Sequence, residues 1–267
     1  MTGPLWQPSA ARIAAANLTA FMARLRKERG LDFKDYDDLY AWSVDDLAGF
    51  WTAVWDFCGV IADDDRGPVV TNADKMPGAA FFPEARLNFA ENLLRRQDDS
   101  DALVFWGEDK VKRRLSHKEL YDRVSRTAQA LAGEGVGPGD RVAGFLPNMP
   151  EAVIAMLATT SLGAVWSSCS PDFGVQGVLD RFGQIEPKVL FCCDGYYYNG
   201  KAIDSRPRLA EFSEQLPSLS KVVVVSYLEE SPDVSAIDRG LRLADFVAPY
   251  KAGRIAFARQ PFNAPLY

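Results

Sequence analysis

Four adjacent side chains that can hydrogen-bond or react lie in the stretch "WSSCSPDFG": Ser167, Ser168, Cys169 and Ser170. The apolar run before them predicts a strand, and the residues after them predict a loop that opens a helix. Ligands of doubly wound sheets bind at such junctions, outside the carboxyl ends of the strands. The serine hydroxyls and the N–H groups of the next helix are suited to a phosphate or a ribose. The stretch therefore predicts a ligand loop; a nucleophilic Cys169 is an alternative for which no neighbouring base is evident.

Elsewhere the sequence predicts no catalytic residue and no metal site. His117 is the single histidine, beside a predicted helix start, and without a second ligand it indicates a capping or solvated role. The four cysteines, Cys192 and Cys193 among them, form neither a disulfide framework nor a metal-binding spacing. The basic runs are interpreted as solvated faces: Arg95, Arg96, Lys112, Arg113 and Arg114. Neither G-x-x-x-x-G-K-S/T nor G-x-G-x-x-G occurs, so local motifs leave nucleotide binding open.

From about residue 100, short apolar runs alternate with helical patterns. Ser116 and Glu119 have the spacing of a capping box, and Asn148 with Glu151 predicts a second helix start. The first of these helices has an apolar face made by Leu120, Val124, Ala128 and Leu131. Further helices are expected at about 175–184 and 201–216, and strands in "ALVFWGE", "RVAGFLP", "AVWSSC", "KVLFCC" and "KVVVVSYL". Nearly continuous apolar strands separated by helices predict an α/β fold with a mainly parallel sheet covered on both faces.

The first 65 or so residues are predicted to be helical. One helix is expected to begin at Ser9 and end at Gly30. A second is expected after Ser43, with Asp46 three positions on as an acidic capping box. Its aromatic face indicates core packing against the main domain: Phe50, Trp51, Trp55 and Phe57. We therefore expect a helical N-terminal extension, 1–97, followed by the main α/β domain, 98–267.

Composition narrows the class of protein. With 267 residues, 48% apolar and 25% charged, the chain is an ordinary globular protein. A net charge of −6 argues against a nucleic-acid partner, since no basic excess is available to neutralise phosphates. No apolar run reaches the length of a membrane span, and the cysteine usage suits a reducing compartment. The sequence therefore predicts a cytoplasmic protein with no membrane partner; it leaves the oligomeric state open.

Several stretches, in the same order along the chain, resemble the adenylate-forming acyl-CoA synthetases. They are "FFPEARLNFAENLL" (81–94), "LSHKELYDRVSRTAQAL" (115–131) and the run from "GVGPGDRV" to "SSCSPDFG" (135–174). The first is similar to the W-F-P-x-x-x-L-N segment that follows the helical extension of that family. The third is similar to its early core of strand, P-N-x-P-E helix and G-A-V strand. The resemblance implies that 98–267 is an incomplete AMP-binding domain.

Within that family, "GAVWSSCSPDFG" (163–174) and its continuation to Phe191 are similar to the acetoacetyl-CoA synthetases. This resemblance implies that the complete enzyme joins acetoacetate to coenzyme A in two steps. In the first step the carboxylate attacks the α-phosphate of ATP, with Mg²⁺ at the phosphates. In the second step the thiol of coenzyme A displaces AMP. Acetate, propionate or another short acid is the alternative substrate.

The same resemblance places one binding position inside this chain. Acetyl-CoA synthetases have two arginines near the 3′-phosphate of coenzyme A in a "D-E-G-V-R-A-G-R" segment, and "DGYYYNGK" (194–201) stands there in this sequence. Lys201 keeps one of the positive charges, whereas Tyr198 replaces the other arginine. The resemblance therefore implies a modified coenzyme A site at Tyr198 and Lys201. The alternative for Lys201 is a solvated residue that opens a helix.

The end of the chain, "PFNAPLY", resembles the phrase that precedes the Ser/Thr/Gly-rich phosphate loop of the family. On that resemblance, the phosphate loop, the residues that hold the adenylate and the C-terminal domain with its catalytic lysine are not in this sequence. We therefore expect an N-terminal portion that is inactive alone. A non-catalytic module that binds coenzyme A or a partner chain is the alternative, since an incomplete sheet exposes an edge and apolar surface.

Overall fold

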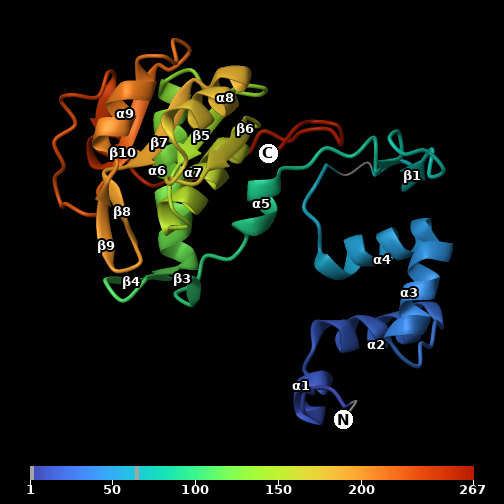
Figure 1. Cartoon of the computed structure of the whole chain (residues 1–267). Helices are drawn as coiled ribbons and strands as arrows, with labels where there is room; N and C mark the ends of the chain where they lie inside the picture. Colours follow the sequence, from blue (N-terminus) through green and yellow to red (C-terminus); the bar gives the residue numbers. More distant parts are fainter. Residues whose placement is uncertain (1–2, 64–65) are drawn as a thin grey trace. The chain divides into compact units, whose positions relative to one another are not determined.

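The computed structural model describes residues 3–63 and 66–267, and the chain forms two compact units, Met1–Ala85 and Arg86–Tyr267 (Figure 1). The domain boundary expected between residues 97 and 98 stays a prediction. The short helix α5 (Phe89–Leu93) precedes that boundary, yet its Ala90 is fully buried in the core of the second unit. Within the described ranges, each helix is too short or too polar to cross a membrane.

The first unit is mainly helical. Its elements are α1 (Ala10–Ala14), α2 (Asn17–Arg29), α3 (Tyr36–Asp45), α4 (Leu47–Cys58), β1 (Val70–Thr71) and β2 (Ala80–Phe81). The prediction of a single helix from Ser9 to Gly30 is wrong, because the helix is interrupted at Ala15 and Ala16, between α1 and α2. Both expected ends are present: the Ser9 hydroxyl accepts the N–H of Arg12 at 3.3 Å, and Gly30 adopts a left-handed φ of 67° after α2.

The helix start predicted at Ser43 is also wrong. Ser43 lies inside α3, where its hydroxyl donates to the Tyr40 carbonyl at 2.7 Å, as serine does within a helix. Asp46 is itself the N-cap of α4 and accepts the N–H of Gly49 at 2.9 Å. Asp35 caps α3 in the same way. Each of these two helices is therefore begun by an aspartate.

The aromatic face of α4 packs inside this unit. The rings of Phe50 and Phe57 lie 6.3 and 5.1 Å from that of Phe21, which is buried. Trp51 and Trp55 pack on the β2 region instead, with centroids 5.6 and 4.4 Å from the rings of Phe81 and Phe82. These contacts are ordinary aromatic packing. Phe50 and Phe57 pack with Phe21 in a small separate core, to which Trp51 and Trp55 do not belong.

The second unit contains a five-stranded parallel sheet in the order β11-β10-β7-β5-β6. Its strands are β5 (Arg141–Phe145), β6 (Val165–Cys169), β7 (Val189–Cys193), β10 (Lys221–Val225) and β11 (Gly240–Arg242). The chain goes from β5 out to β6 and then returns past β5 to β7, so the strand order reverses between β5 and β7. This is a doubly wound arrangement, and it confirms the α/β prediction.

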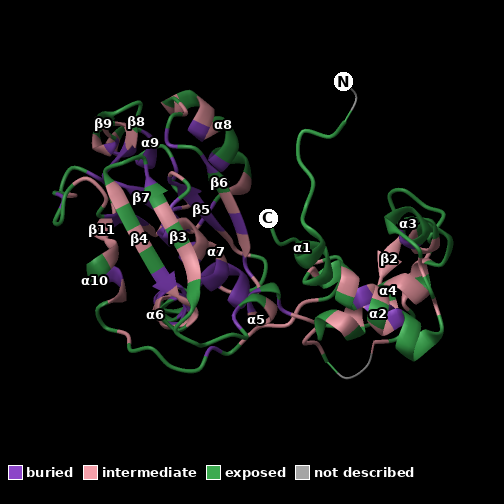
Figure 2. Cartoon of the chain, turned by 90° about the horizontal axis from the view of Figure 1, so that it is seen from below, coloured by how far each residue is buried: buried purple, intermediate pink, exposed green. Residues whose placement is uncertain are grey.

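Side chains alternate between the two faces of this sheet, and each face has its own core. Val189, Phe191 and Cys193 of β7 pack on the side of α6 (His117–Gly133), α7 (Pro150–Ser161) and α10 (Leu243–Val247). Leu190 and Cys192 face α8 (Val175–Ile185) and α9 (Arg206–Ser213). Figure 2 shows buried residues in the interior of this unit and exposed residues toward its surface. All five residues of β7 are buried. This double burial explains why the strand reads as a continuous apolar run.

The helix starts in this unit test the sequence patterns directly. The capping box at Ser116 and Glu119 is confirmed, with both of its hydrogen bonds present at the start of α6. The start predicted at Asn148 is wrong: Met149 stands at the N-cap of α7 and makes no side-chain cap. Glu151 instead forms a bidentate ion pair with Arg113 at 2.7 and 2.8 Å. The partner lies 38 residues away in the sequence, so local spacing did not reveal it.

Two antiparallel hairpins accompany the sheet: β3 (Asp101–Gly107) with β4 (Val111–Ser116), and β8 (Gly195–Tyr198) with β9 (Lys201–Asp204). The helix predicted at about 201–216 is therefore wrong in its first part, because 201–204 form a strand and α9 begins at Arg206. Asn199 and Gly200 both have positive φ, 50° and 75°, as a tight two-residue hairpin turn requires.

Candidate functional site at the carboxyl end of β7

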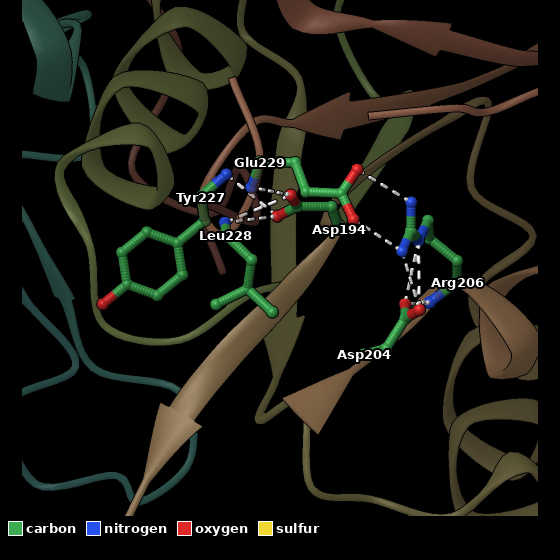
Figure 3. A network of polar contacts seen from close by, with 6 residues as sticks. All are labelled: Asp194, Asp204, Arg206, Tyr227, Leu228 and Glu229. Carbon is green, nitrogen blue, oxygen red and sulfur yellow. Dashed lines mark hydrogen bonds and ion pairs between the residues drawn. The ribbon is translucent and has the colours of Figure 1, made fainter. Parts of the chain in front are cut away.

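The residue that follows β7 is the buried Asp194, whose side chain organises this end of the sheet (Figure 3). One carboxylate oxygen accepts the N–H groups of Tyr227 and Leu228 at 2.9 and 3.0 Å. The other accepts those of Leu228 and Glu229 at 3.1 and 2.8 Å. Three consecutive N–H groups after β10 thus converge on one carboxylate. Hydrogen bonds to an ionised acceptor are stronger than neutral ones, so this contact fixes the loop after β10.

The backbone of Asp194 fixes the β8–β9 hairpin at the same place. Its N–H donates to the Val225 carbonyl at 3.1 Å, and its own carbonyl accepts the N–H of Ser205 at 2.9 Å. Ser205 follows the last residue of β9, so both ends of the hairpin are attached to one residue. At Gly195, an added Cβ would collide with the side chain of Leu228 and the carbonyl of Ile203. A glycine is therefore needed where the hairpin leaves the sheet.

A charged group completes the attachment on the outer side of the hairpin (Figure 3). The Arg206 guanidinium bonds to both oxygens of Asp204, at 2.8 to 3.2 Å, and to both oxygens of Glu229, at 2.8 and 3.1 Å. The hydrogen bonds from Arg206 hold the pKa of the Asp204 carboxyl below its usual value. Because Arg206 is paired with two carboxylates, we assign it a structural role in holding the base of the hairpin.

The tip of the hairpin carries both residues that the sequence singled out as a coenzyme A site. Tyr198 and Lys201 are direct cross-strand partners on either side of the turn. Both are exposed, and 66% of the Tyr198 surface is accessible. The N–H of Gly200 donates to the Glu108 carboxylate of the β3–β4 turn at 2.9 Å, which anchors the tip. Lys201 lies on a strand and does not open a helix, contrary to the alternative considered above.

The second predicted site lies at the carboxyl end of β6, an edge strand of the sheet. Ser167, Ser168 and Cys169 are the last residues of β6, and Ser170 is the first residue beyond it. Ser168 is exposed, and its hydroxyl lies 2.6 Å from that of Tyr267. The N–H of Trp166 donates to the Leu266 carbonyl at 3.1 Å, so the final residues run alongside β6. Part of this edge is therefore occupied by the chain itself.

The cysteines are poor nucleophiles in their surroundings. Burial raises the pKa of Cys169 to about 11; the charge of Arg181 acts in the opposite direction, whereas that of Asp172 adds to the increase. Burial likewise raises the pKa of Cys193 to about 12 and that of Cys192 well above its usual value. A thiol acts as a nucleophile in its thiolate form, which these environments disfavour. Within ranges 3–63 and 66–267, no cluster of histidine, cysteine or acidic residues could hold a metal ion.

The two predicted sites lie in separate regions, both at the carboxyl ends of strands of this sheet. β5 separates β7 from β6, which corresponds to about 10 Å at the usual strand spacing. His117 belongs to neither site, because it is the first residue of α6. Sequence reasoning missed Asp194, Gly195 and Arg206. The Asn199-Gly200 pair is a typical sequence signal for a two-residue hairpin turn and could have predicted the hairpin of β8 and β9. No local sequence pattern indicated the contacts of Asp194.

The fold and the strand-end loops therefore define a doubly wound α/β protein with a polar, loop-rich carboxyl edge. Comparison with known families gives its class. A family model described as "AMP-binding enzyme" matches residues 89–250, and one described as "Acetyl-coenzyme A synthetase N-terminus" matches residues 36–93. The first match covers more than half of the chain, and the chain belongs to the AMP-binding enzyme family.

Within that family, the chain is similar to acetoacetyl-CoA synthetases. It is 49% identical to the acetoacetyl-coenzyme A synthetase of Rhizobium meliloti over 99% of this chain, and it covers 40% of that protein. It is 40% identical to the acetoacetyl-CoA synthetase of Macaca fascicularis over 98% of this chain and 40% of that protein. The solved acetoacetyl-CoA synthetase from Streptomyces lividans matches with a TM-score of 0.88 and 41% identity, over 99% of this chain and 40% of that one. The chain thus spans about two fifths of the length of the relatives it matches.

Proposed function

We propose that this chain supplies the N-terminal portion of an acetoacetate–CoA ligase, which converts acetoacetate, ATP and coenzyme A into acetoacetyl-CoA, AMP and diphosphate. The observation that carries the proposal is the similarity to an acetoacetyl-CoA synthetase along 99% of the chain at 49% identity. Acetyl-CoA or another short-chain acyl-CoA synthesis is the alternative within the same family. We further propose that the protein acts in the cytoplasm.

Coenzyme A is the ligand that the described residues fit. Its 3′-phosphate is a compact anion, and the exposed ammonium group of Lys201 is suited to it as a point charge. Tyr198, across the hairpin from Lys201, offers an exposed ring and a hydroxyl to the neighbouring part of the ligand. Arg206 is not available for this role, because it is bonded to Asp204 and Glu229.

ATP and Mg²⁺ fit the described residues less well. The sequence has no glycine-rich phosphate-binding motif of the common kinds, and ranges 3–63 and 66–267 offer no metal-ligand cluster. Cys169, Cys192 and Cys193 have raised pKa values, which argues against a nucleophile among them. We assign no adenylation step to residues of this chain and propose that the 267 residues alone do not form acyl-adenylate.

Acetoacetate-dependent exchange between ATP and labelled diphosphate tests the inactivity proposal. The 267-residue chain is expected to give no exchange above a blank without protein. Exchange that depends on acetoacetate would contradict the proposal. To test the substrate, the full-length gene product is assayed with acetoacetate, acetate and propionate. The proposal predicts the highest kcat/KM for acetoacetate, and a higher value for acetate would favour the alternative.

A non-catalytic role in binding coenzyme A or a partner remains a second candidate, and the exposed, well-anchored hairpin is the observation that favours it. Coenzyme A binding to the hairpin is expected under both proposals, so ligase activity of the full-length gene product separates them. Coenzyme A binding that depends on Lys201, without acetoacetate-dependent exchange between ATP and diphosphate, supports a binding module. Acetoacetate-dependent exchange by the full-length product supports the ligase.

A further inference from the structure

A cavity of about 410 Å³ lies on the face of the sheet that α6, α7 and α10 cover, beside the carboxyl end of β10. Its volume falls in the range of small-molecule binding pockets. It lies beside the attachment of the hairpin, because the carbonyl of its lining residue Val225 accepts the N–H of Asp194, but no residue of the hairpin itself or of the end of β6 lines it. Its charged lining residues are Arg123, Arg126 and Glu151, and most of the others are apolar.

Two arginines give this cavity a positive charge. Arg123 and Arg126 are one turn apart on α6, and both are partly buried. In the part of the chain that the structure describes, neither guanidinium has an ion pair or a hydrogen bond. The lining carboxylate, Glu151, is already neutralised by its bidentate pair with Arg113. Two positive charges therefore stay uncompensated at the cavity, in a chain whose net charge is −6.

The acidic residues near Arg123 and Arg126 do not neutralise them in the described ranges. Glu119 belongs to the capping box at Ser116, and Asp245 of α10 pairs with Arg242 at 2.7 Å. Asp122 lies one helical turn from Arg126 but forms no ion pair with it in the described ranges. Partly buried guanidinium groups are usually paired, because desolvating a charge costs free energy. Their unpaired state here indicates a place for an external anion.

The remaining walls of the cavity are mainly apolar, and Thr127 and Ser226 are the polar exceptions. α7 contributes the buried Ile154, β10 contributes Val225, and α10 contributes Leu243 and Val247. The cations come from one helix, whereas the apolar side chains come from the other three elements. A ligand that matches both parts has an anionic head and a short aliphatic body.

We propose that this cavity binds a small organic anion whose carboxylate or phosphate group is held by Arg123 and Arg126 and whose aliphatic part packs on Ile154, Leu243 and Val247. Guanidinium groups bind both kinds of anion through paired N–H donors, so the two share one recognition chemistry. This inference goes beyond the proposed ligase function, and its test does not require ligase activity.

Calorimetric titration of the 267-residue chain with hexyl phosphate, hexanoate and inorganic phosphate tests the proposal. Both hexyl compounds are expected to bind, and inorganic phosphate is expected to bind more weakly because it lacks the aliphatic part. The double variant Arg123→Gln/Arg126→Gln is expected to weaken hexyl phosphate binding by about tenfold or more. Lys118→Gln, which removes an exposed cation from the same helix, should leave the affinity unchanged. Lys201→Ala should also leave it unchanged, which separates this cavity from the hairpin.

A folding control and three further variants keep the result interpretable. Circular dichroism confirms folding, and if the double variant does not fold, each single substitution is expected to give part of the loss. Ala248→Trp, at an exposed lining position, should weaken the hexyl compounds more than inorganic phosphate. The proposal is overturned if neither hexyl compound binds, if the arginine variants retain full affinity, or if Lys201→Ala abolishes binding. Equal affinity for inorganic and hexyl phosphate would overturn the role of the apolar walls.

Discussion

The ends of β7 and β6 lie at the same edge of one sheet but are built in opposite ways. After β7, the buried Asp194 gathers three N–H groups and fixes a hairpin whose tip is exposed. At the end of β6, the serines look more reactive in the sequence, yet Cys169 is buried and Ser168 contacts Tyr267. At the end of β7, a buried carboxylate therefore holds an exposed hairpin in place, and no buried group does this for the described residues at the end of β6.

The largest expected effect belongs to Asp194→Ala. Removing the carboxylate leaves the N–H groups of Tyr227, Leu228 and Glu229 without their acceptor. We expect the free energy of unfolding of the second unit to fall by about 3 kcal/mol, since hydrogen bonds to charged groups are individually worth about 1.5–3 kcal/mol. Urea unfolding measures this loss. Hydrogen exchange should become faster at the amides of residues 227–229.

Asp109→Ala is the matched control for that experiment, because its side chain is 81% exposed. It should change the stability by less than about 0.5 kcal/mol. If Asp194→Ala were as mild as this control, with unchanged exchange at 227–229, the contrast between the two strand ends would be wrong.

Gly195→Ala is expected to have the next largest effect. The new methyl group would meet Leu228 and the Ile203 carbonyl, so the hairpin must shift, at a cost of about 1–3 kcal/mol. Gly183 in α8 has open space at the corresponding position, and Gly183→Ala should stabilise by about 0.5–1 kcal/mol. Thermal unfolding of the two variants should therefore shift in opposite directions. Shifts of the same sign would contradict the close packing at Gly195.

The sequence predicted those parts of the fold that depend on neighbours in the chain. The capping box at Ser116 and the apolar face of α6 involve residues within a few turns of one another, and the apolar runs of β5 and β7 report burial on both faces. The predicted start at Asn148 was one residue early, since Met149 is the N-cap of α7, and the pairing of Glu151 with Arg113 spans 38 residues. The contacts of Asp194 span 33 to 35 residues, so no local pattern could reveal them.

The candidate site residues likewise depend on contacts that local sequence patterns do not reveal. Tyr198 and Lys201 were found through a family resemblance, whereas their placement on a hairpin follows from the Asn199-Gly200 turn. The expected helix from about 201 ignored that turn. Ser167 and Ser168 were placed correctly on β6, but the contact of Ser168 with Tyr267 depends on a residue 99 positions later.

A smaller effect is expected at Cys169, and it depends on pH. The folded state keeps the thiol protonated up to its pKa of about 11, whereas an unfolded thiol with the ordinary value of 9.0 ionises earlier. The unfolded state therefore binds fewer protons between these values, and stability falls as the pH rises from 9 toward 11. Below pH 9 this effect is absent.

Cys169→Ala removes that titration, so its stability should fall less steeply between pH 9 and 11 than that of the unsubstituted chain. Urea unfolding at several pH values measures the two slopes. Alkylation by iodoacetamide at neutral pH should label the exposed Cys58 and spare Cys169. Rapid labelling of Cys169 in the folded chain would restore it as a candidate nucleophile and weaken the comparison.

The smallest effect is expected for Ser168→Ala. Its hydroxyl contact with Tyr267 lies at the surface, where water replaces the lost partner. The change in stability should stay within about 0.5 kcal/mol. A loss as large as that of Asp194→Ala, measured in the same urea series, would mean that the end of β6 is organised as strongly as the end of β7.

Titration with coenzyme A tests whether the hairpin tip binds this ligand through Lys201. The 267-residue chain is titrated with coenzyme A and with its 3′-dephospho form, before and after Lys201→Ala, with Lys118→Ala as the exposed-lysine control. We expect coenzyme A to bind more tightly than the dephospho form, by on the order of fivefold for one exposed ion pair, and Lys201→Ala to remove this difference. Equal affinity for the two ligands, or a difference that persists without Lys201, would contradict a coenzyme A site at the hairpin.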